Sequence, residues 1–535
     1  MHTACNGNRP KPGWYPTRLL DLVDIGSDDG LVRLIQTTEV ATLSGPYCTL
    51  SHCWGKVHII QLRQETNNAL RSGISMEQLP KTFREAILAT KQLGVRYIWI
   101  DSLCIMQGDL SDWFREAALM HKVYSYSHCN LSASASKDSS EGLYRNRNPR
   151  TLDTTWVELY VAGLGSSITT TRCEMHDYFF WKHNVSQCTI NRRAWVTQER
   201  LLAPRVLHFG KYQLFWECRE HDACESYPEG LPSLFVAQTY TNFKALDPAV
   251  YAKKIAREGG DVGPDTASYR VWNAIVQAYS RTALTVAGDK LIALSGIAKR
   301  MTPTMNDEYV AGMWRRHLES ALLWNVDYNE NINSASLARP STYRAPTWSW
   351  ASLDCAIATQ NPSERGSSIE VNDVVLNYAT DDMTGVITSG WLDLSGSLKP
   401  MCLAQRDYGT GKRWYMVVNG TVVRPQDESL EESDRLGPIL HFDVPPFYDE
   451  AFDSDNAKQR LFFMVGRMPT VDHDYMLVLL LRLVDVERKL FERIGIAVSS
   501  ASDGREILLA AVDEETERSL PCLRYENGQH TIRIL

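Results

Sequence analysis

Residues 95–101 read V95-R-Y-I-W-I-D101, an apolar run that ends in a carboxylate. We expect a buried strand that stops at Asp101, because short apolar runs rich in β-branched and aromatic residues favour strands. A helix is expected just before it. Pro80 suits the first helical turn, Gly94 supplies the stop, and apolar residues recur between them at helical spacing.

The same alternation of strand and helix continues on both sides of this pair. Y47-C-T-L-S51 is typical of a short strand, and N130-L-S-A-S-A135 of another. A second helix is expected to begin near Ser111, where one apolar stripe is made by Trp113, Ala117, Met120 and Tyr124. Parallel strands need a helix-length connection between them. The sequence therefore predicts an α/β fold with a parallel sheet.

Polar and aromatic residues follow three of the predicted strands. They are Ser51, His52, Trp54 and Gly55 after the first strand, Asp101 and Ser102 after the second, and residues 136–140 after the third. Ligands of parallel α/β sheets bind beyond the carboxyl ends of the strands. We expect these residues to line one edge of the sheet and to form a binding site there.

Two carboxylates near this edge each have two interpretations. Asp101 either caps the following turn, as strand-end aspartates often do, or faces the hydroxyls of a ligand. Glu199 lies one helical turn after Trp195 and beside Arg193 and Arg200. It forms either a surface ion pair of little energetic value, or a carboxylate beside an aromatic wall that can stabilise positive charge.

Two other chemistries are less favoured. His52 and Cys53 are adjacent, so on a strand they point to opposite faces and the histidine does not activate the thiol. Cys218, His221 and Cys224 have a spacing that suits zinc, but no fourth ligand is evident. We expect no metal and no bound cofactor.

Composition limits the class of protein. A net charge of -8 and a pI near 5.9 give no general attraction to nucleic acid or to anionic membranes. The most apolar stretch, residues 476–484, is about half of the roughly 20 residues that a bilayer requires, and no signal segment is evident at the N-terminus. The 12 cysteines are scattered without framework spacing, which suits reduced thiols. The expected location is the cytoplasm.

The pattern along the chain changes several times. We expect an N-terminal arm over residues 1–42, the α/β domain over 43–218, a mainly helical extension over 219–350 and a β-rich domain over 351–535. Within the last of these, Asn419-Gly420 predicts a hairpin turn and residues 426–434 an acidic loop.

Three ordered blocks of sequence carry a family resemblance. They are Y47-C-T-L-S-H-C-W-G55, R96-Y-I-W-I-D-S-L-C-I-M-Q107 and N191-R-R-A-W-V-T-Q-E-R-L-L202. In this order they resemble the signature blocks of the fungal heterokaryon-incompatibility (HET) domain, which places that domain over residues 43–218. The resemblance implies self/non-self recognition in a fungus, with activation leading to growth arrest or programmed cell death, a form of innate immunity.

HET domains are in turn similar to Toll/interleukin-1 receptor (TIR) domains, parallel α/β folds of which some cleave NAD. The spacing in W195-V-T-Q-E199 resembles the TIR catalytic helix, and an insertion of about fifty residues precedes it where TIR domains run straight on. By this resemblance Glu199 is the catalytic carboxylate of an NAD hydrolase and Trp195 a wall of the nicotinamide pocket. The other candidate ligand-binding residues are Ser51, His52, Trp54, Gly55, Asp101, Ser102, Gln107, Arg193 and Gln198.

Two alternatives to the hydrolase remain open. The domain is a non-catalytic module that recruits partners, or its scaffold is reused by an enzyme of specialised metabolism. For the hydrolase, a nucleotide is the expected substrate. For both the hydrolase and the interaction module, we expect a protein partner or self-association, and no nucleic-acid or membrane ligand.

Overall fold

The computed structural model describes most of the 535 residues. The described ranges are 13–23, 30–153, 155–162, 168–232, 244, 264–328, 338–362, 367–407, 412–423, 439–444, 460–469, 475–500 and 502–535. The predicted acidic loop at 426–434 lies outside them. The chain forms two compact units, residues 1–247 (unit 1) and 248–535 (unit 2). Within the described ranges, no helix combines the length and the apolar character needed to cross a bilayer.

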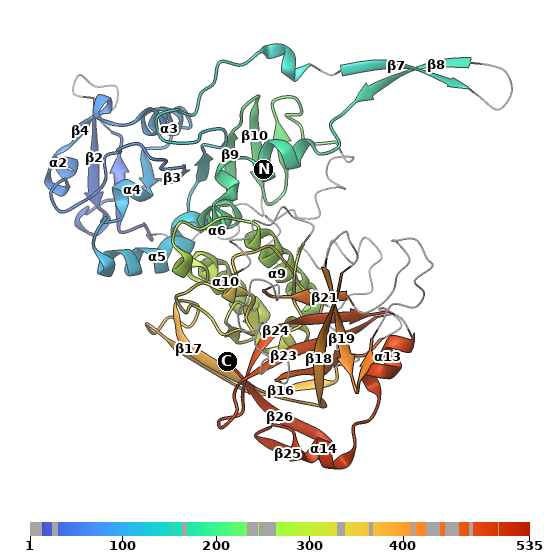
Figure 1. The fold of residues 1–535 in the computed structure, drawn as a ribbon. Coiled ribbons are helices and arrows are strands. Elements are labelled where there is room, and N and C mark those ends of the chain that lie inside the picture. The colour runs from blue at the N-terminus through green and yellow to red at the C-terminus, as the bar shows by residue number, and fades with distance from the viewer. Residues whose placement is uncertain are drawn as a thin grey trace. The chain divides into compact units, whose positions relative to one another are not determined.

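Unit 1 is built on a nine-stranded sheet with the order β11-β10-β9-β6-β3-β5-β1-β2-β4 (Figure 1). Its strands are β1 Arg18–Asp21, β2 Leu31–Gln36, β3 Tyr47–Ser51, β4 Ile74–Ser75, β5 Tyr97–Ile100, β6 Cys129–Ser132, β9 Arg205–Phe209, β10 Leu214–Cys218 and β11 Asp222–Cys224. β3 is parallel to both β5 and β6, and β6 is parallel to β9. The other pairs are antiparallel. The predicted α/β fold with parallel strands is confirmed.

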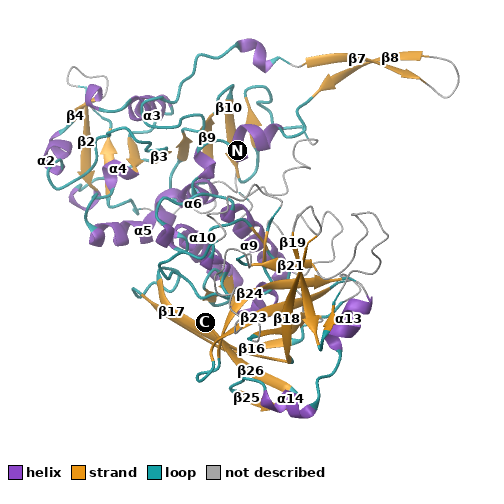
Figure 2. Ribbon diagram, in the orientation of Figure 1, coloured by secondary structure: helices purple, strands orange, loops and turns teal. Residues whose placement is uncertain are grey.

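The helices of unit 1 connect these strands (Figure 2). They are α2 Asn67–Ser72, α3 Lys81–Gln92, α4 Asp101–Cys104, α5 Leu110–Ser125 and α6 Ala194–Leu202. The α3 helix follows Pro80 and is succeeded by Gly94 in the left-handed region (φ 72°), as the sequence predicts. The side chain of Asp109 caps α5 by accepting from the backbone N–H of Asp112 at 3.1 Å.

The prediction of an N-terminal arm is wrong for residues 18–21 and 31–36. These residues form β1 and β2, and β1 pairs antiparallel with β5 inside the main sheet. Leu19 and Leu20 are both fully buried, because two neighbouring strands and α4 enclose this short segment. The sheet also continues past residue 218, since β11 pairs with β10.

The insertion before α6 contains a separate β-hairpin. β7 (Thr155–Ala162) and β8 (Ile168–Met175) pair antiparallel over their whole length. Among the described strands they pair only with each other, as a two-stranded ribbon (Figure 1). This explains why the connection is longer than the usual link between a strand and a helix.

Unit 2 combines a helical segment with a β-rich region, as predicted. Its main helices are α9 Pro264–Ser280, α10 Ile292–Met305, α11 Leu318–Ala321, α13 Ser502–Leu509 and α14 Glu514–Ser519. The helical segment and the strands belong to one compact unit, so the predicted boundary near residue 350 does not separate two bodies. The side chain of Asn273 in α9, for example, donates to the carbonyl of Gln360 at 2.8 Å.

The sheet of unit 2 has eleven strands, with the main path β16-β17-β26-β24-β23-β22-β18-β19-β20. They are β16 Ile369–Tyr378, β17 Ile387–Gly396, β18 Leu398–Asp407, β19 Lys412–Val418, β20 Thr421–Val422, β21 Ile439–Phe442, β22 Leu461–Arg467, β23 Met476–Asp485, β24 Leu490–Ser499, β25 Arg524–Glu526 and β26 Gln529–Ile534. The apolar stretch 476–484 is thus a buried strand. Asn419 and Gly420 both have positive φ (50° and 74°) between β19 and β20, which confirms the predicted hairpin turn.

Candidate functional site

The residues that follow β3, β5 and β6 lie together. The indole N–H of Trp54 donates to Asp101 Oδ2 at 2.9 Å, which joins the first two clusters. Ser139 of the third cluster donates to the carbonyl of Cys53 at 3.3 Å. Gly55 has φ 70°, and a Cβ there would lie 2.2 Å from the Cβ of Asp138. Glycine is therefore required at this turn for close packing against the neighbouring loop.

Glu199 of α6 reaches the same edge of the sheet. Its carboxylate accepts a hydrogen bond from Ser51, the last residue of β3, and another from the hydroxyl of Tyr124. Ser51 in turn receives a hydrogen bond from the side-chain amide of Asn130 at 2.9 Å. The surface-ion-pair interpretation of Glu199 is wrong, because the residue is only 7% exposed and Arg200 pairs elsewhere.

Burial raises the pKa of Glu199 to about 7, since the charged form loses its hydration. The hydrogen bond from Ser51 and the positive charge of Arg193 act against this rise, whereas the negative charge of Asp101 adds to it. A carboxyl group with a pKa near neutrality changes its charge readily in the physiological range, which is a property of groups that take part in catalysis.

Two further buried groups at this edge lack partners within the described part of the chain. His52 is 2% exposed, and neither ring nitrogen has a hydrogen-bond partner; the nearest carboxylate oxygen, Asp101 Oδ1, lies 3.6 Å from Nδ1. Burial also lowers the pKa of His52, so the ring is neutral at pH 7. The hydroxyl of Ser102 is likewise buried and unpartnered. Unpartnered buried polar groups cost about 1–3 kcal/mol each, so they favour a site that receives a polar ligand.

Asp101 is the first residue of α4, and the cap position before it is occupied by Ile100, which makes no side-chain cap hydrogen bond. Asp101 Oδ1 accepts from the backbone N–H of Ser102 at 2.6 Å, in the first turn of α4. Its Oδ2 holds Trp54, as described above. The side chain remains 27% exposed, so its carboxylate is also accessible to a ligand.

The remaining predicted site residues are Arg193, Trp195, Gln107 and Gln198, and their side chains have different partners. The Arg193 guanidinium donates to the carbonyl of His52 and belongs to the edge. Trp195 lies one turn before Glu199 on α6 and packs edge-on against Trp113, with ring centroids 6.2 Å apart. Gln107 and Gln198 instead turn to other partners, since their side-chain amides donate to the carbonyl of Ile105 at 2.9 Å and to the sulfur of Met120 at 3.9 Å.

Sequence reasoning missed a buried polar network beside this edge. His208 contacts Ser134 Oγ through Nδ1 (3.1 Å) and Glu217 Oε2 through Nε2 (3.2 Å), and Glu217 forms two hydrogen bonds with Arg200. The order serine, histidine, carboxylate is that of a hydrolytic triad. However, the three side chains are at most 2% exposed and Glu217 is fully engaged by Arg200, so the network supports the fold. Lys244 extends the network by donating to the carbonyls of Arg200 and Ala203.

Thiol and metal chemistry find no support. Burial raises the pKa of Cys53, and that of Cys104 to about 12, so both remain poorly nucleophilic thiols. In the described ranges, no group of three His, Cys, Asp or Glu residues is arranged to hold a metal ion, and this includes Cys218, His221 and Cys224.

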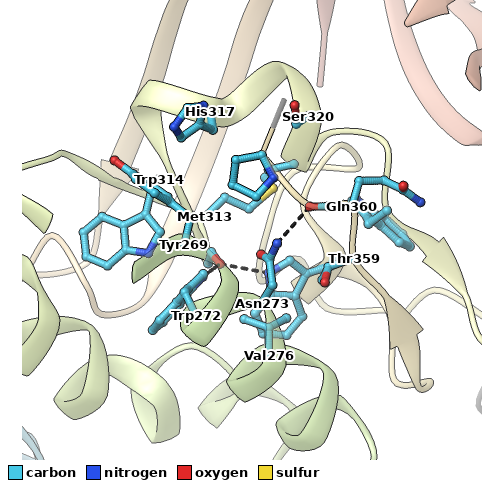
Figure 3. A pocket seen from close by; sticks show the side chains of 15 residues that line it. Tyr269, Trp272, Asn273, Val276, Met313, Trp314, His317, Ser320, Thr359 and Gln360 are labelled. Atoms are coloured by element: carbon cyan, nitrogen blue, oxygen red, sulfur yellow. Dashed lines mark hydrogen bonds between the residues drawn. The ribbon is translucent and has the colours of Figure 1, made fainter. Parts of the chain in front are cut away.

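Unit 2 contains a pocket of a different kind (Figure 3). Its lining includes aromatic side chains from α9 and the segments that follow, among them Tyr269, Trp272, Trp314 and Trp350. The indole N–H groups of Trp272 and Trp350 both donate to the carbonyl of Gly312 at 3.0 Å. The cavity measures about 20 Å³, which is room for about one water molecule. This pocket is a feature of aromatic packing.

One comparison with known proteins matches a segment of unit 1 that contains this edge. Residues 47–199 match the family model described as heterokaryon incompatibility protein (HET). The matched segment begins at the first residue of β3 and ends at Glu199, so it includes every residue of the edge described above. No curated protein and no solved structure matches the chain. Residues 47–199 of this chain are thus similar to the heterokaryon-incompatibility (HET) family, and this similarity supports a role related to heterokaryon incompatibility.

Proposed function

We propose that this edge of the unit 1 sheet binds NAD and that Glu199 promotes hydrolysis of the nicotinamide–ribose bond. The observation that carries the proposal is the placement of the Glu199 carboxyl, bonded to Ser51 at the end of β3 and close enough to Asp101 for their charges to interact. The TIR-like spacing of Trp195 and Glu199 supports the same chemistry.

The groups around Glu199 suit the parts of a dinucleotide. The exposed portion of the Asp101 carboxylate is suited to accept hydrogen bonds from ribose hydroxyls. His52 and Ser102 offer unpartnered polar atoms. Arg193 donates one of its five N–H groups to the carbonyl of His52, and a guanidinium suits the pyrophosphate. Trp195 offers an aromatic surface for the nicotinamide ring.

The reaction moves positive charge from the nicotinamide ring to the ribose, and Glu199 can assist this step. The C1′–N bond breaks, its electron pair leaves with neutral nicotinamide, and the ribose becomes an oxocarbenium ion. The ionised Glu199 carboxylate stabilises this cation, as carboxylates do in glycoside hydrolysis. Water then adds to C1′ and loses a proton, which gives ADP-ribose. Only the ionised form of Glu199 can act in this way.

Loss of NAD provides a route from this reaction to growth arrest or cell death, which we propose as the consequence of activation. The site would act in the cytoplasm, and clustering of several chains would switch it on. The isolated chain is then expected to be nearly silent.

The experiment compares nicotinamide release by three forms of the full chain, each clustered by biotinylation and streptavidin. Wild type is expected to release nicotinamide, and Glu199→Gln to lose at least about a hundredfold in rate, the scale of one electrostatic catalytic contact. Glu116→Gln is the matched control, because Glu116 is also a buried carboxyl (2% exposed) whose pKa is raised by burial, but it lies on α5 beside Arg115.

Three results would contradict the proposal. Equal rates for wild type and Glu199→Gln would show that the carboxyl is not involved. Equal losses in Glu199→Gln and Glu116→Gln, with both variants folded by circular dichroism, would show that the effect is not specific to the carboxyl at this edge. Absence of release from clustered wild type would leave the edge to a non-catalytic interaction module, or to an enzyme of specialised metabolism with another substrate.

A further inference from the structure

The hairpin formed by β7 and β8 has no role in the candidate site, and its surface is unusual for a soluble protein. Four of its large side chains are exposed: Trp156 (48%), Leu159 (48%), Tyr160 (73%) and Met175 (57%). Both faces of the ribbon carry exposed side chains, because Trp156 and Tyr160 alternate with Leu159 along β7. A two-stranded ribbon is at best marginally stable in water by itself, and three or more strands are usually needed.

The two strands differ in how they can pair with a copy of themselves. In β8, Arg172 and Glu174 flank Cys173. If two β8 strands pair antiparallel about Cys173, each Arg172 lies directly opposite Glu174 of the other chain, and opposite charges in this position stabilise a sheet. In β7 the only charged residue is Glu158, which has no opposite charge to meet in a second β7.

We propose that this hairpin is a self-association element, in which β8 pairs antiparallel with β8 of a second copy of this chain about a two-fold axis at Cys173. The two ribbons then form one four-stranded sheet. The contact is isologous, because the same strand serves on both sides. The inference concerns assembly and stands independently of NAD cleavage.

The proposed sheet has a defined arrangement of side chains. Cys173 faces the same side of the ribbon as its cross-strand neighbour Val157, so the two apolar faces join across the axis. Directly opposite residues in antiparallel strands have Cβ atoms about 4.5–5.5 Å apart. The two Cys173 thiols are therefore within reach of a short bismaleimide. Cys173 is partly exposed and free. Pairing through a single strand edge buries little surface, so the dimer is expected to dissociate on dilution.

The first test uses the unmodified full chain. A short bismaleimide is expected to give a covalent dimer whose yield rises with protein concentration, and Cys173→Ser is expected to abolish it. A chain that is monomeric by light scattering at every concentration would overturn the proposal. So would a dimer that is still cross-linked in Cys173→Ser.

The second test reverses one charge. Glu174→Arg places two arginines opposite each other in the dimer, so at least a tenfold weaker association is expected. Within the hairpin, position 174 faces Trp156, whose ring already lies under Arg172 at 4.6 Å, and Glu174 accepts from the Tyr227 hydroxyl at 3.4 Å and lies 3.4 Å from His176 Nε2. The melting temperature of Glu174→Arg therefore has to be measured beside its association. Tyr160→Arg is the control, because it adds positive charge to the same ribbon on β7. If Tyr160→Arg weakens association and Glu174→Arg does not, the copies meet through β7 and the proposed register is wrong. Loss of dimer only in Glu174→Arg, with an unchanged melting temperature, supports it.

Discussion

Glu199 in unit 1 and Arg493 in unit 2 are both buried ionisable residues, but they have opposite surroundings. Arg493 is fully buried, forms an ion pair with Asp443, donates to the carbonyls of Leu322 and Trp324, and stacks on the Trp324 ring at 3.6 Å. Glu199 has hydroxyl partners and no direct ion pair in the described structure. A buried charge with a full set of partners stabilises a fold, whereas a buried carboxyl with a pKa near 7 is available for chemistry.

The largest effect is expected from the fully partnered residue. Arg493→Met removes the closer counter-charge of the buried Asp443 and the hydrogen bonds to the carbonyls of Leu322 and Trp324, so unit 2 should lose about 3 kcal/mol of stability; Arg339, 3.1 Å from Asp443, limits the loss. Urea unfolding followed by tryptophan fluorescence measures this loss.

Arg533 offers a matched control for that substitution. It also pairs with an aspartate (Asp393, 2.8 Å) and stacks on a tryptophan (Trp391, 3.5 Å), but its side chain is 31% exposed. Arg533→Met should cost less than about 1 kcal/mol, because exposed ion pairs contribute little. Equal losses from both substitutions would show that burial does not explain the difference.

The next largest effect is expected for Glu199, where substitution should increase the stability of the protein instead of reducing it. Because the folded pKa of Glu199 (about 7) lies above the usual value of 4.5, the folded state holds the proton more tightly, and stability falls as pH rises from about 4.5 to about 7. The full difference corresponds to roughly 3 kcal/mol. The free energy of unfolding of Glu199→Gln should therefore equal that of wild type near pH 4.5. At pH 8 it should be higher than that of wild type by up to about 3 kcal/mol. A constant difference between the two proteins from pH 5 to pH 8 would contradict the raised pKa.

A smaller effect is expected in the aromatic region of unit 2. Trp324 donates its indole N–H to the carbonyl of Trp348 at 2.9 Å, whereas the buried indole N–H of Trp314 has no hydrogen-bond partner among the described residues. Both Trp→Phe changes remove similar volume, so Trp324→Phe should destabilise unit 2 by about 1–2 kcal/mol more than Trp314→Phe. Thermal unfolding of the two variants measures the difference. A larger loss for Trp314→Phe would indicate an unrecognised partner for that group.

The smallest effect concerns the charge next to Glu199. Asp101→Asn keeps an oxygen that accepts from Trp54 but removes the negative charge that helps to raise the pKa of Glu199. The pH midpoint of nicotinamide release should move down by less than about one unit, because burial is the main cause of the rise. A midpoint that moves to higher pH would show that the two carboxyl groups do not interact in this way.

The sequence predicts the parallel strands and the edge well, because both depend on local patterns. V95-R-Y-I-W-I100 and Y47-C-T-L-S51 are apolar runs with polar residues directly after them, and strand ends gather at one edge by topology. β1 was not recognised, since its four residues show no clear alternation and their place in the sheet depends on pairing with β2 on one side and with the distant β5 on the other.

The site was only partly predictable for a similar reason. Tyr124 lies on the apolar stripe of its helix, and the sequence does not show that its hydroxyl reaches Glu199 across the fold. Asn130 had one recognisable signal, namely a polar residue in a core strand. Gln107 and Gln198 occur within the family blocks, but their side chains have local partners instead. Side-chain direction depends on packing that spacing alone does not fix.

The pH dependence of nicotinamide release by the clustered chain tests the central claim most directly. We expect the rate to rise about tenfold per pH unit up to a midpoint near 7, because the ionised Glu199 carboxylate is the active form. The rise should be absent in Glu199→Gln. No release from clustered wild type at any pH, or the same profile in Glu199→Gln, would contradict the account.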